Sequence, residues 1–138
     1  MSLKTRAFAA LAVAAALVTV SVPAAAHHGT NISYDRSKPV TIKGTITEFR
    51  LANPHPQLFV DVKDDSGKVT NWGCEVAANP YQLMLSGWTK QRSATALKPG
   101  TVVTVTLAPS RAGTPVGVVI KVFNEKAEEI LGVAADQQ

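Results

Sequence analysis

The chain has 138 residues, with 14 Lys and Arg residues, 10 Asp and Glu residues, and a formal net charge of +4. Two of the cations lie within the first six residues, so the rest of the chain carries 12 cations and 10 acids, a balance of +2. A balance this weak predicts no nucleic-acid partner. The single cysteine, Cys74, excludes an intramolecular disulfide and is expected to be a buried, inert thiol, so packing, a metal or association must hold the fold.

The first 26 residues have the order of segments that is typical of an export signal. Two cations precede an apolar run over residues 7–18, a Ser-Val-Pro break follows, and three alanines end the segment. We expect cleavage after Ala26, with cleavage after Ala24 as the alternative, and a mature protein in the periplasm. The apolar run is shorter than the roughly 20 residues that a transmembrane anchor needs, so no membrane span is expected after cleavage.

Five segments of the mature chain have the alternating polarity of β-strands. The first, over residues 40–51, contains Gly44 and a slip in its alternation, as expected for a strand that is bent and bulged. The other four are predicted over residues 58–63, 69–76, 103–107 and 117–123. The acidic pair at 64–65 is predicted to be part of a tight turn and not an acid–base or metal site.

A short helix is predicted between the third and fourth strands. Asn79 is suited to cap it, Pro80 to occupy its first turn and Gly87 to end it. Residues 88–96 are expected to be a polar connection. The tail from residue 124 has the composition for a short helix through residues 130–131, followed by an end with no reason to be ordered.

Three strands, a helix and two strands is the element order of the OB (oligonucleotide/oligosaccharide-binding) barrel. The expected fold is therefore all-β with one short helix, a five-stranded OB-like barrel preceded by a cleaved signal peptide. A small immunoglobulin-like sandwich is the alternative, but it needs about seven strands and no helix after the third. The expected organisation is a signal peptide over 1–26, an N-terminal arm over 27–39, the barrel over 40–123 and a C-terminal tail over 124–138.

The three histidines are the candidate metal ligands. Cleavage after Ala26 gives His27 a free α-amine, which can chelate a metal together with its own ring, and His55 would add a third nitrogen. Alternatively, His28 binds through its ring, the preceding amide and the amine; the two modes exclude each other and both stay open. Nitrogen ligands of this kind favour Cu(II). The competing interpretation is that the pair has no role and that His55 only hydrogen-bonds within its turn.

The two loops that frame the binding face of an OB barrel contain His55 and Arg111. Trp72 is a third candidate for ligand binding, although core packing is its more common role. No nucleophile setting or phosphate-binding loop is present, and Cys74 alternates with Glu75 across its strand, so the two form no dyad. We therefore expect a periplasmic binding module without catalysis, with a small ligand or a periplasmic protein as partner. The alternative is a copper-binding protein using His27 with His55 or His28.

Several short motifs resemble a bacterial exported family that is catalogued only as a domain of unknown function, number 6152 (DUF6152). The matching segments are His27-His28-Gly29, Tyr34-Asp35, Lys38-Pro39-Val40-Thr41, Gly44-Thr45, Asn53-Pro54-His55 and Asn71-Trp72. The resemblance extends from His27 to about Phe123, and the sequence departs from the family's pattern at Gly29, at Pro56-Gln57 and around Gly73-Cys74. The resemblance implies a periplasmic location and an all-β barrel, and it brings no activity, substrate or catalytic residue.

Overall fold

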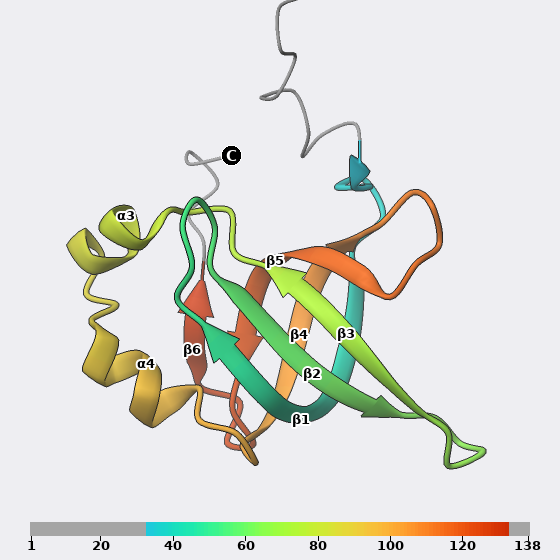
Figure 1. Cartoon of the computed structure of the whole chain (residues 1–138). Coiled ribbons are helices and arrows are strands. Elements are labelled where there is room, and N and C mark those ends of the chain that lie inside the picture. The colour runs from blue at the N-terminus through green and yellow to red at the C-terminus, as the bar shows by residue number, and fades with distance from the viewer. Residues whose placement is uncertain (1–32, 133–138) are drawn as a thin grey trace, which may run out of the picture.

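The computed structural model describes residues 33–132, and their strands form the predicted barrel (Figure 1). Two short helices lie between the third and fourth strands, where the sequence predicted one. The elements are β1 (Val40–Arg50), β2 (Gln57–Lys63), β3 (Val69–Glu75), α3 (Pro80–Leu85), α4 (Lys90–Ala96), β4 (Val102–Pro109), β5 (Val116–Phe123) and β6 (Glu129–Gly132). No helix of the described part of the chain is long and apolar enough to cross a bilayer.

β1 bends in its middle, so its two halves pair with different strands of the barrel. Its first half pairs with β4, and its second half pairs with β2, with a register shift between Ile46 and Glu48. A Cβ at Gly44 would lie 2.8 Å from Cγ1 of Val60 and closer still to the carbonyl oxygen of Asp61, so only glycine fits this bend. The predicted bulge and the role of Gly44 are confirmed.

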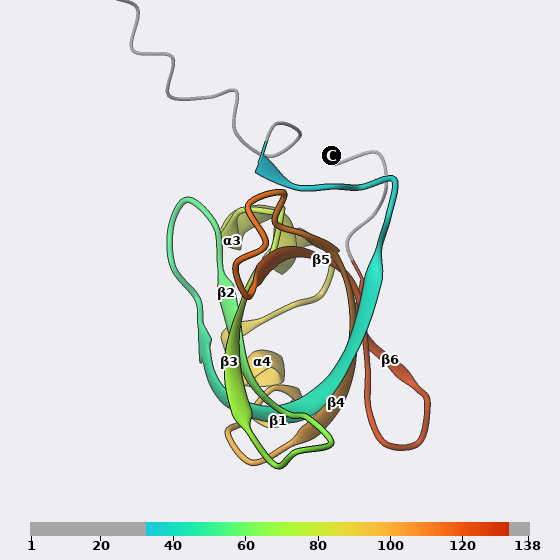
Figure 2. The same ribbon diagram turned by 90° about the vertical axis from the view of Figure 1, so that its right-hand side faces the viewer.

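A parallel pairing between β3 and β5 closes the barrel. Gly73, Cys74 and Glu75 lie opposite Val116, Gly117 and Val118, and β5 continues into an antiparallel ladder with β4. The resulting ring of β1, β2, β3, β5 and β4 is visible nearly end-on in Figure 2. Closure leaves no free edge among these five strands where they pair, which removes the exposed edge groups that invite association.

The barrel interior is aliphatic. The fully buried large side chains are Ile46, Leu58, Val60, Val76, Leu97, Val103, Val105, Leu107, Val118, Val119, Val122 and Leu131. Cys74 is buried among them, and burial raises the pKa of its thiol to about 12. The buried thiol predicted from the sequence is confirmed.

The helical segment begins with the predicted cap. Asn79 accepts from the backbone N–H of Gln82, and the Gln82 side chain accepts from the backbone N–H of Asn79. The predicted connection over residues 88–96 was wrong: α4 occupies most of it. The Thr89 hydroxyl caps α4 by accepting from the backbone N–H of Arg92. A buried Trp88 fixes the start of α4 against the core.

The C-terminal prediction was also wrong. The segment around Ile130 and Leu131 is strand β6, which pairs with the end of β5, and not a helix. Leu131 is fully buried and Ile130 packs against the core. Pairing with β5 and burial of Leu131 outweigh the local preference of a short segment, because a helix of this length gains little by itself.

Candidate functional site

His55 lies in the loop over residues 51–56, which joins β1 to β2. The loop contains a cis peptide bond between Asn53 and Pro54. Pro56 is buried, and its carbonyl oxygen accepts from the backbone N–H of Val76 at 2.8 Å. This bond ties the end of the loop, next to His55, to the end of β3.

Glu75 is the partner of His55. It lies at the end of β3 and alternates to the outside, since Cys74 before it is buried. Its Oε1 contacts Nδ1 of His55. A carboxylate at Nδ1 favours the tautomer that carries its proton there and leaves Nε2 as the acceptor or metal-ligating atom. Both side chains are partly exposed, and no described residue hydrogen-bonds Nε2.

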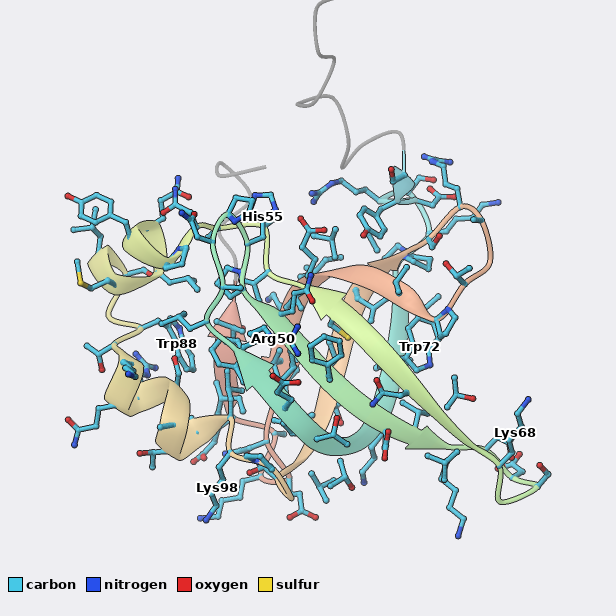
Figure 3. The ribbon with its side chains drawn as sticks, in the orientation of Figure 1. Arg50, His55, Lys68, Trp72, Trp88 and Lys98 are labelled. Carbon is cyan, nitrogen blue, oxygen red and sulfur yellow. The ribbon has the colours of Figure 1, made fainter. Side chains whose placement is uncertain are left out.

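Tyr34 completes the arrangement from the N-terminal arm. Its hydroxyl donates to Oε2 of Glu75 at 3.3 Å. Partial burial raises the pKa of Tyr34, and the charge of Glu75 and this hydrogen bond raise it further. The phenol therefore stays protonated and remains a donor to Glu75. We call Tyr34, His55 and Glu75 the His55 cluster (Figure 3 labels His55).

The arm docks on the loop over residues 110–115, which joins β4 to β5. Tyr34 forms an isolated antiparallel bridge with Ser110, and the backbone N–H of Arg111 donates to the carbonyl oxygen of Ser33 at 2.9 Å. The Arg111 guanidinium lies 3.5 Å from Oδ1 of Asp35. The pKa of Asp35 is lowered, chiefly by the Ser37 hydroxyl that donates to it, with Arg111 as a smaller contribution. The arm thus links the loop of Arg111 to Glu75 and, through Glu75, to His55.

The predicted site residues have different positions. His55 and Arg111 lie in the two framing loops and are linked through the arm. Trp72 does not join them: it packs against the core on the face of β3 opposite Glu75, because successive side chains of a strand alternate. His27 and His28 lie outside the described residues. Within residues 33–132, no three His, Cys, Asp or Glu side chains form a metal-binding group.

Sequence reasoning missed Glu75 and Tyr34. One signal for Glu75 was available, since it follows the buried Cys74 on the opposite face and ends its strand beside the loop of His55. Tyr34 had no such signal, because its position depends on an arm that docks through backbone bonds to Pro109, Ser110 and Arg111.

A cation–π contact between Arg50 and Phe59 lies on the outer face of β1 and β2. The Arg50 guanidinium stacks over the Phe59 ring at 5.2 Å from its centroid, and Glu48 pairs with Arg50 at 2.9 Å. Phe59 in turn lies beside Gly73 of β3, which leaves room for the ring. The ring is therefore covered by the protein's own arginine.

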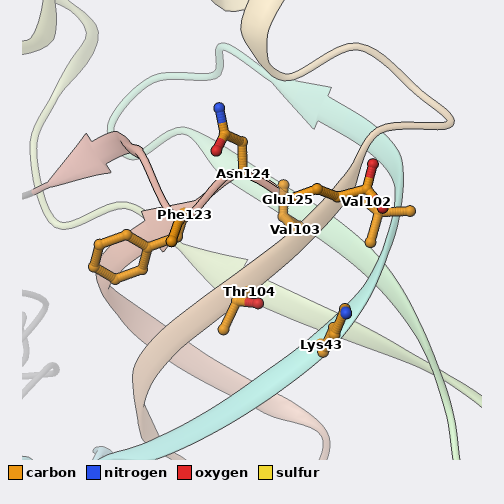
Figure 4. A pocket seen from close by; sticks show the side chains of 8 residues that line it. Lys43, Val102, Val103, Thr104, Phe123, Asn124 and Glu125 are labelled. Atoms are coloured by element: carbon orange, nitrogen blue, oxygen red, sulfur yellow. The ribbon is translucent and has the colours of Figure 1, made fainter.

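A surface hollow of about 380 Å³, within the range of small-molecule sites, opens elsewhere (Figure 4). It is lined by Lys43, Val102, Val103, Thr104, Phe123, Asn124, Glu125 and Ala127. These residues belong to β1, the start of β4, the end of β5 and the turn that follows β5. The His55 cluster adjoins the opposite ends of those strands, so the hollow is separate from it.

The family model of a family of unknown function, DUF6152, matches residues 13–120. The chain belongs to this family. The resemblance seen in the motifs is thereby confirmed. The family description gives no activity, and no curated protein matches the chain significantly.

Two solved structures resemble this DUF6152 member. Both are crystal forms of Rim1 from S. cerevisiae, described as a mitochondrial single-stranded DNA-binding protein. The first is 13% identical with a TM-score of 0.45, covering 64% of this chain and 92% of that chain. The second is 16% identical with a TM-score of 0.46, covering 66% of this chain and 97% of that chain.

The prediction that excluded nucleic acid as a partner is corrected by these structures. Rim1 is described as a protein that binds single-stranded DNA, so the exclusion of nucleic acid is withdrawn for this barrel. The exclusion depended on net charge, which averages over the chain. Residues 76–124 contain five cations and no acid, so the average conceals a strongly uneven distribution.

Proposed function

We propose that this DUF6152 member is a periplasmic binding protein without catalytic activity, which takes a small ligand at the His55 cluster. One observation carries the proposal. Glu75 positions the imidazole of His55 through Nδ1, while Nε2 is left without a partner among the described residues. The two framing loops and the arm surround this group, which is the usual place for a ligand on an OB barrel.

The chemistry of the cluster supports binding over catalysis. The Tyr34 hydroxyl has its proton engaged by Glu75, and its raised pKa makes it a poor nucleophile. The Cys74 thiol faces the interior. A catalytic histidine activates a nucleophile within hydrogen-bond reach, and the described residues place none beside Nε2.

A second candidate function is Cu(II) binding through His55 and the N-terminal histidines. The pair of Glu75 and His55 has the arrangement in which a carboxylate orients a metal-ligating imidazole. Ser33 is held beside Arg111 and follows His28 by five residues, which an extended chain spans over up to about 17 Å. A chain of this length would allow His27 and His28 to approach this end of the barrel.

The first experiment separates a ligand from a metal. Protein is purified from the periplasm of an expression host, treated with EDTA, and titrated with fractionated periplasmic small molecules while its amide NMR spectrum is recorded. We expect shifts around His55, Tyr34 and Arg111 that disappear in His55→Ala and persist in the control Trp72→Phe. If no fraction shifts these signals in wild type, the binding proposal is wrong.

The second experiment tests copper. The EDTA-treated protein receives one equivalent of Cu(II), and its electron paramagnetic resonance spectrum is recorded. We expect nitrogen hyperfine structure that changes in His55→Ala but not in Trp72→Phe. Loss of the orienting carboxylate in Glu75→Gln should weaken binding by about 10- to 100-fold. A spectrum that is unchanged in His55→Ala would restrict the metal to the chain terminus and exclude the shared site.

A further inference from the structure

Apolar side chains gather on the side of the barrel that carries α3 and α4. Tyr81 is 64% exposed, Met84 51% and Leu85 69%, and all three belong to α3. Leu51, 39% exposed, follows β1 and lines a hollow together with α4. Two residues elsewhere, Val40 and Val69, complete the exposed large hydrophobics of the described chain. Four of six thus lie on one side, and grouped exposed apolar residues often mark an interaction site.

Cations accompany these apolar groups. Lys90, Arg92 and Lys98 lie on α4 and directly after it, and Arg92 stacks on the Trp88 ring at 4.4 Å from its centroid. None of the three forms an ion pair with a described acid. Glu48 lines the same hollow as Lys90 and Lys98, and it is already paired with Arg50. The side is therefore cationic as well as apolar.

A hollow of about 390 Å³, again in the range of small-molecule sites, continues the apolar surface inward between the end of β1 and α4. The apolar side chains of Phe49, Leu51 and Leu97 line it, together with the charged side chains of Glu48, Lys90 and Lys98. Ser93 on its wall is buried, and its hydroxyl has no partner among the described residues. The exposed apolar side chains thus adjoin a hollow that apolar groups of a partner could enter.

We propose that this face, the α3–α4 surface, docks on an anionic lipid bilayer. The surface consists of Leu51, Tyr81, Met84, Leu85, Lys90, Arg92 and Lys98. Figures 1 and 2 agree that both helices lie on the same side of the barrel, opposite the face that Figure 2 shows. Apolar side chains would enter the interface while the long cationic side chains reach phosphate groups, as in peripheral proteins that lie on membranes.

Charge favours a bilayer over a second copy of this chain. A symmetric dimer through the α3–α4 surface would bring Lys90, Arg92 and Lys98 of two copies together. The acid that lines the adjoining hollow, Glu48, is already paired with Arg50. An anionic bilayer supplies negative charge opposite these three cations, whichever way the protein is rotated on the membrane plane. Tyr81 adds an aromatic group with a polar end, a type that is enriched at membrane interfaces.

The test is co-sedimentation with vesicles, using protein purified from the periplasm. Vesicles contain equal amounts of phosphatidylglycerol and phosphatidylcholine, or phosphatidylcholine alone. We expect binding to the anionic vesicles that weakens as salt is raised, because the Debye length shortens. Each cation near a charged surface contributes about 1 kcal/mol, so Lys90→Gln with Lys98→Gln should reduce partitioning about 30-fold. Met84→Ser with Leu85→Ser should also abolish most binding.

A matched control lies on the hairpin between β2 and β3. Lys68→Gln with Val69→Ser removes one cation and one 54% exposed apolar group beside Asp64 and Asp65, and it should leave binding unchanged. All variants are first compared by urea unfolding. The proposal is overturned if wild type ignores anionic vesicles, binds neutral vesicles equally well, or loses as much binding through the control. Concentration-dependent dimers that Leu85→Ser abolishes would assign the face to a second copy.

Discussion

Glu75 contacts both other members of the His55 cluster. It accepts from Tyr34 through one oxygen and contacts His55 through the other. A carboxylate held from both sides cannot rotate to solvent without breaking a contact, so it fixes the imidazole orientation. Its removal should therefore affect two side chains that lie 21 residues apart in sequence.

Because the pKa of Tyr34 is raised in the folded protein, we expect the free energy of unfolding to fall at alkaline pH. The folded chain holds the phenol proton more tightly than the unfolded chain, whose tyrosine titrates near 10.0. The associated stability is complete below that pH and is lost as the pH rises through the folded pKa. We expect Tyr34→Phe to reduce the alkaline decline of the urea midpoint. In Glu75→Gln, the absorbance titration of Tyr34 should move toward 10.0; an unmoved titration would contradict the contact.

Cys74 should be chemically inert in the folded protein. A pKa raised to about 12 from 9.0 leaves roughly a thousand-fold fewer thiolates near neutrality than an ordinary cysteine has. We expect alkylation in buffer to be slower than in urea by at least this factor. The same protein in urea is the control, since it has one cysteine. Equal rates in buffer and urea would mean that the thiol is exposed.

The sequence predicted single residues well where local alternation decides. Burial of Cys74 and the outward direction of Glu75 followed from strand period alone. It did not predict that Glu75 meets His55 and Tyr34, because the three come from a strand end, a loop and an arm that only the closed barrel brings together. Trp72 shares its strand face with Cys74, so the same alternation indicated core packing for it, as the structure shows.

At the scale of elements, β1 depends on one glycine. Gly44 lies where β1 bends across β2, and an added methyl would meet Asp61 and Val60. We expect Gly44→Ala to lower the free energy of unfolding by about 1–3 kcal/mol, as overpacking does. The neighbouring exposed Lys43→Ala should change it by less than about 0.5 kcal/mol. Urea unfolding measures both, and equal effects would remove the steric explanation.

β6 belongs to the core although it was expected to be part of a tail. Leu131 is fully buried and its strand pairs with β5. We expect Leu131→Ala to lower the free energy of unfolding by about 2–5 kcal/mol, because it leaves a cavity. Glu128→Ala in the preceding turn is the control and should have a smaller effect. A negligible loss for Leu131→Ala would show that β6 detaches from the barrel.

Helices and strands were predicted correctly where the segment itself contains the polarity pattern or the capping residue. The five barrel strands and the cap of α3 follow from alternation and from Asn79. α4 was missed because its apolar contacts are few and its start depends on Thr89, a weaker cap signal. β6 was missed because four residues become a strand only when β5 offers an edge.

At the scale of the whole molecule, strand pairing and core packing close the barrel without a disulfide bond. The parallel pairing of β3 with β5 joins segments more than 40 residues apart, and one continuous core spans all five barrel strands. We expect a single unfolding transition with the same midpoint by tryptophan fluorescence and by circular dichroism, unchanged by a reductant. Two separated midpoints would show that the helices over residues 80–96 unfold apart from the barrel.

The docking of the arm on Ser110 and Arg111 has a practical consequence for anyone who handles this protein. An affinity tag or fluorescent fusion joined directly before Ser33 would be attached beside the loop of Arg111 and would crowd the candidate site. A label at Ser66, in the hairpin turn between β2 and β3, would report on the molecule from a distance without obstructing either surface.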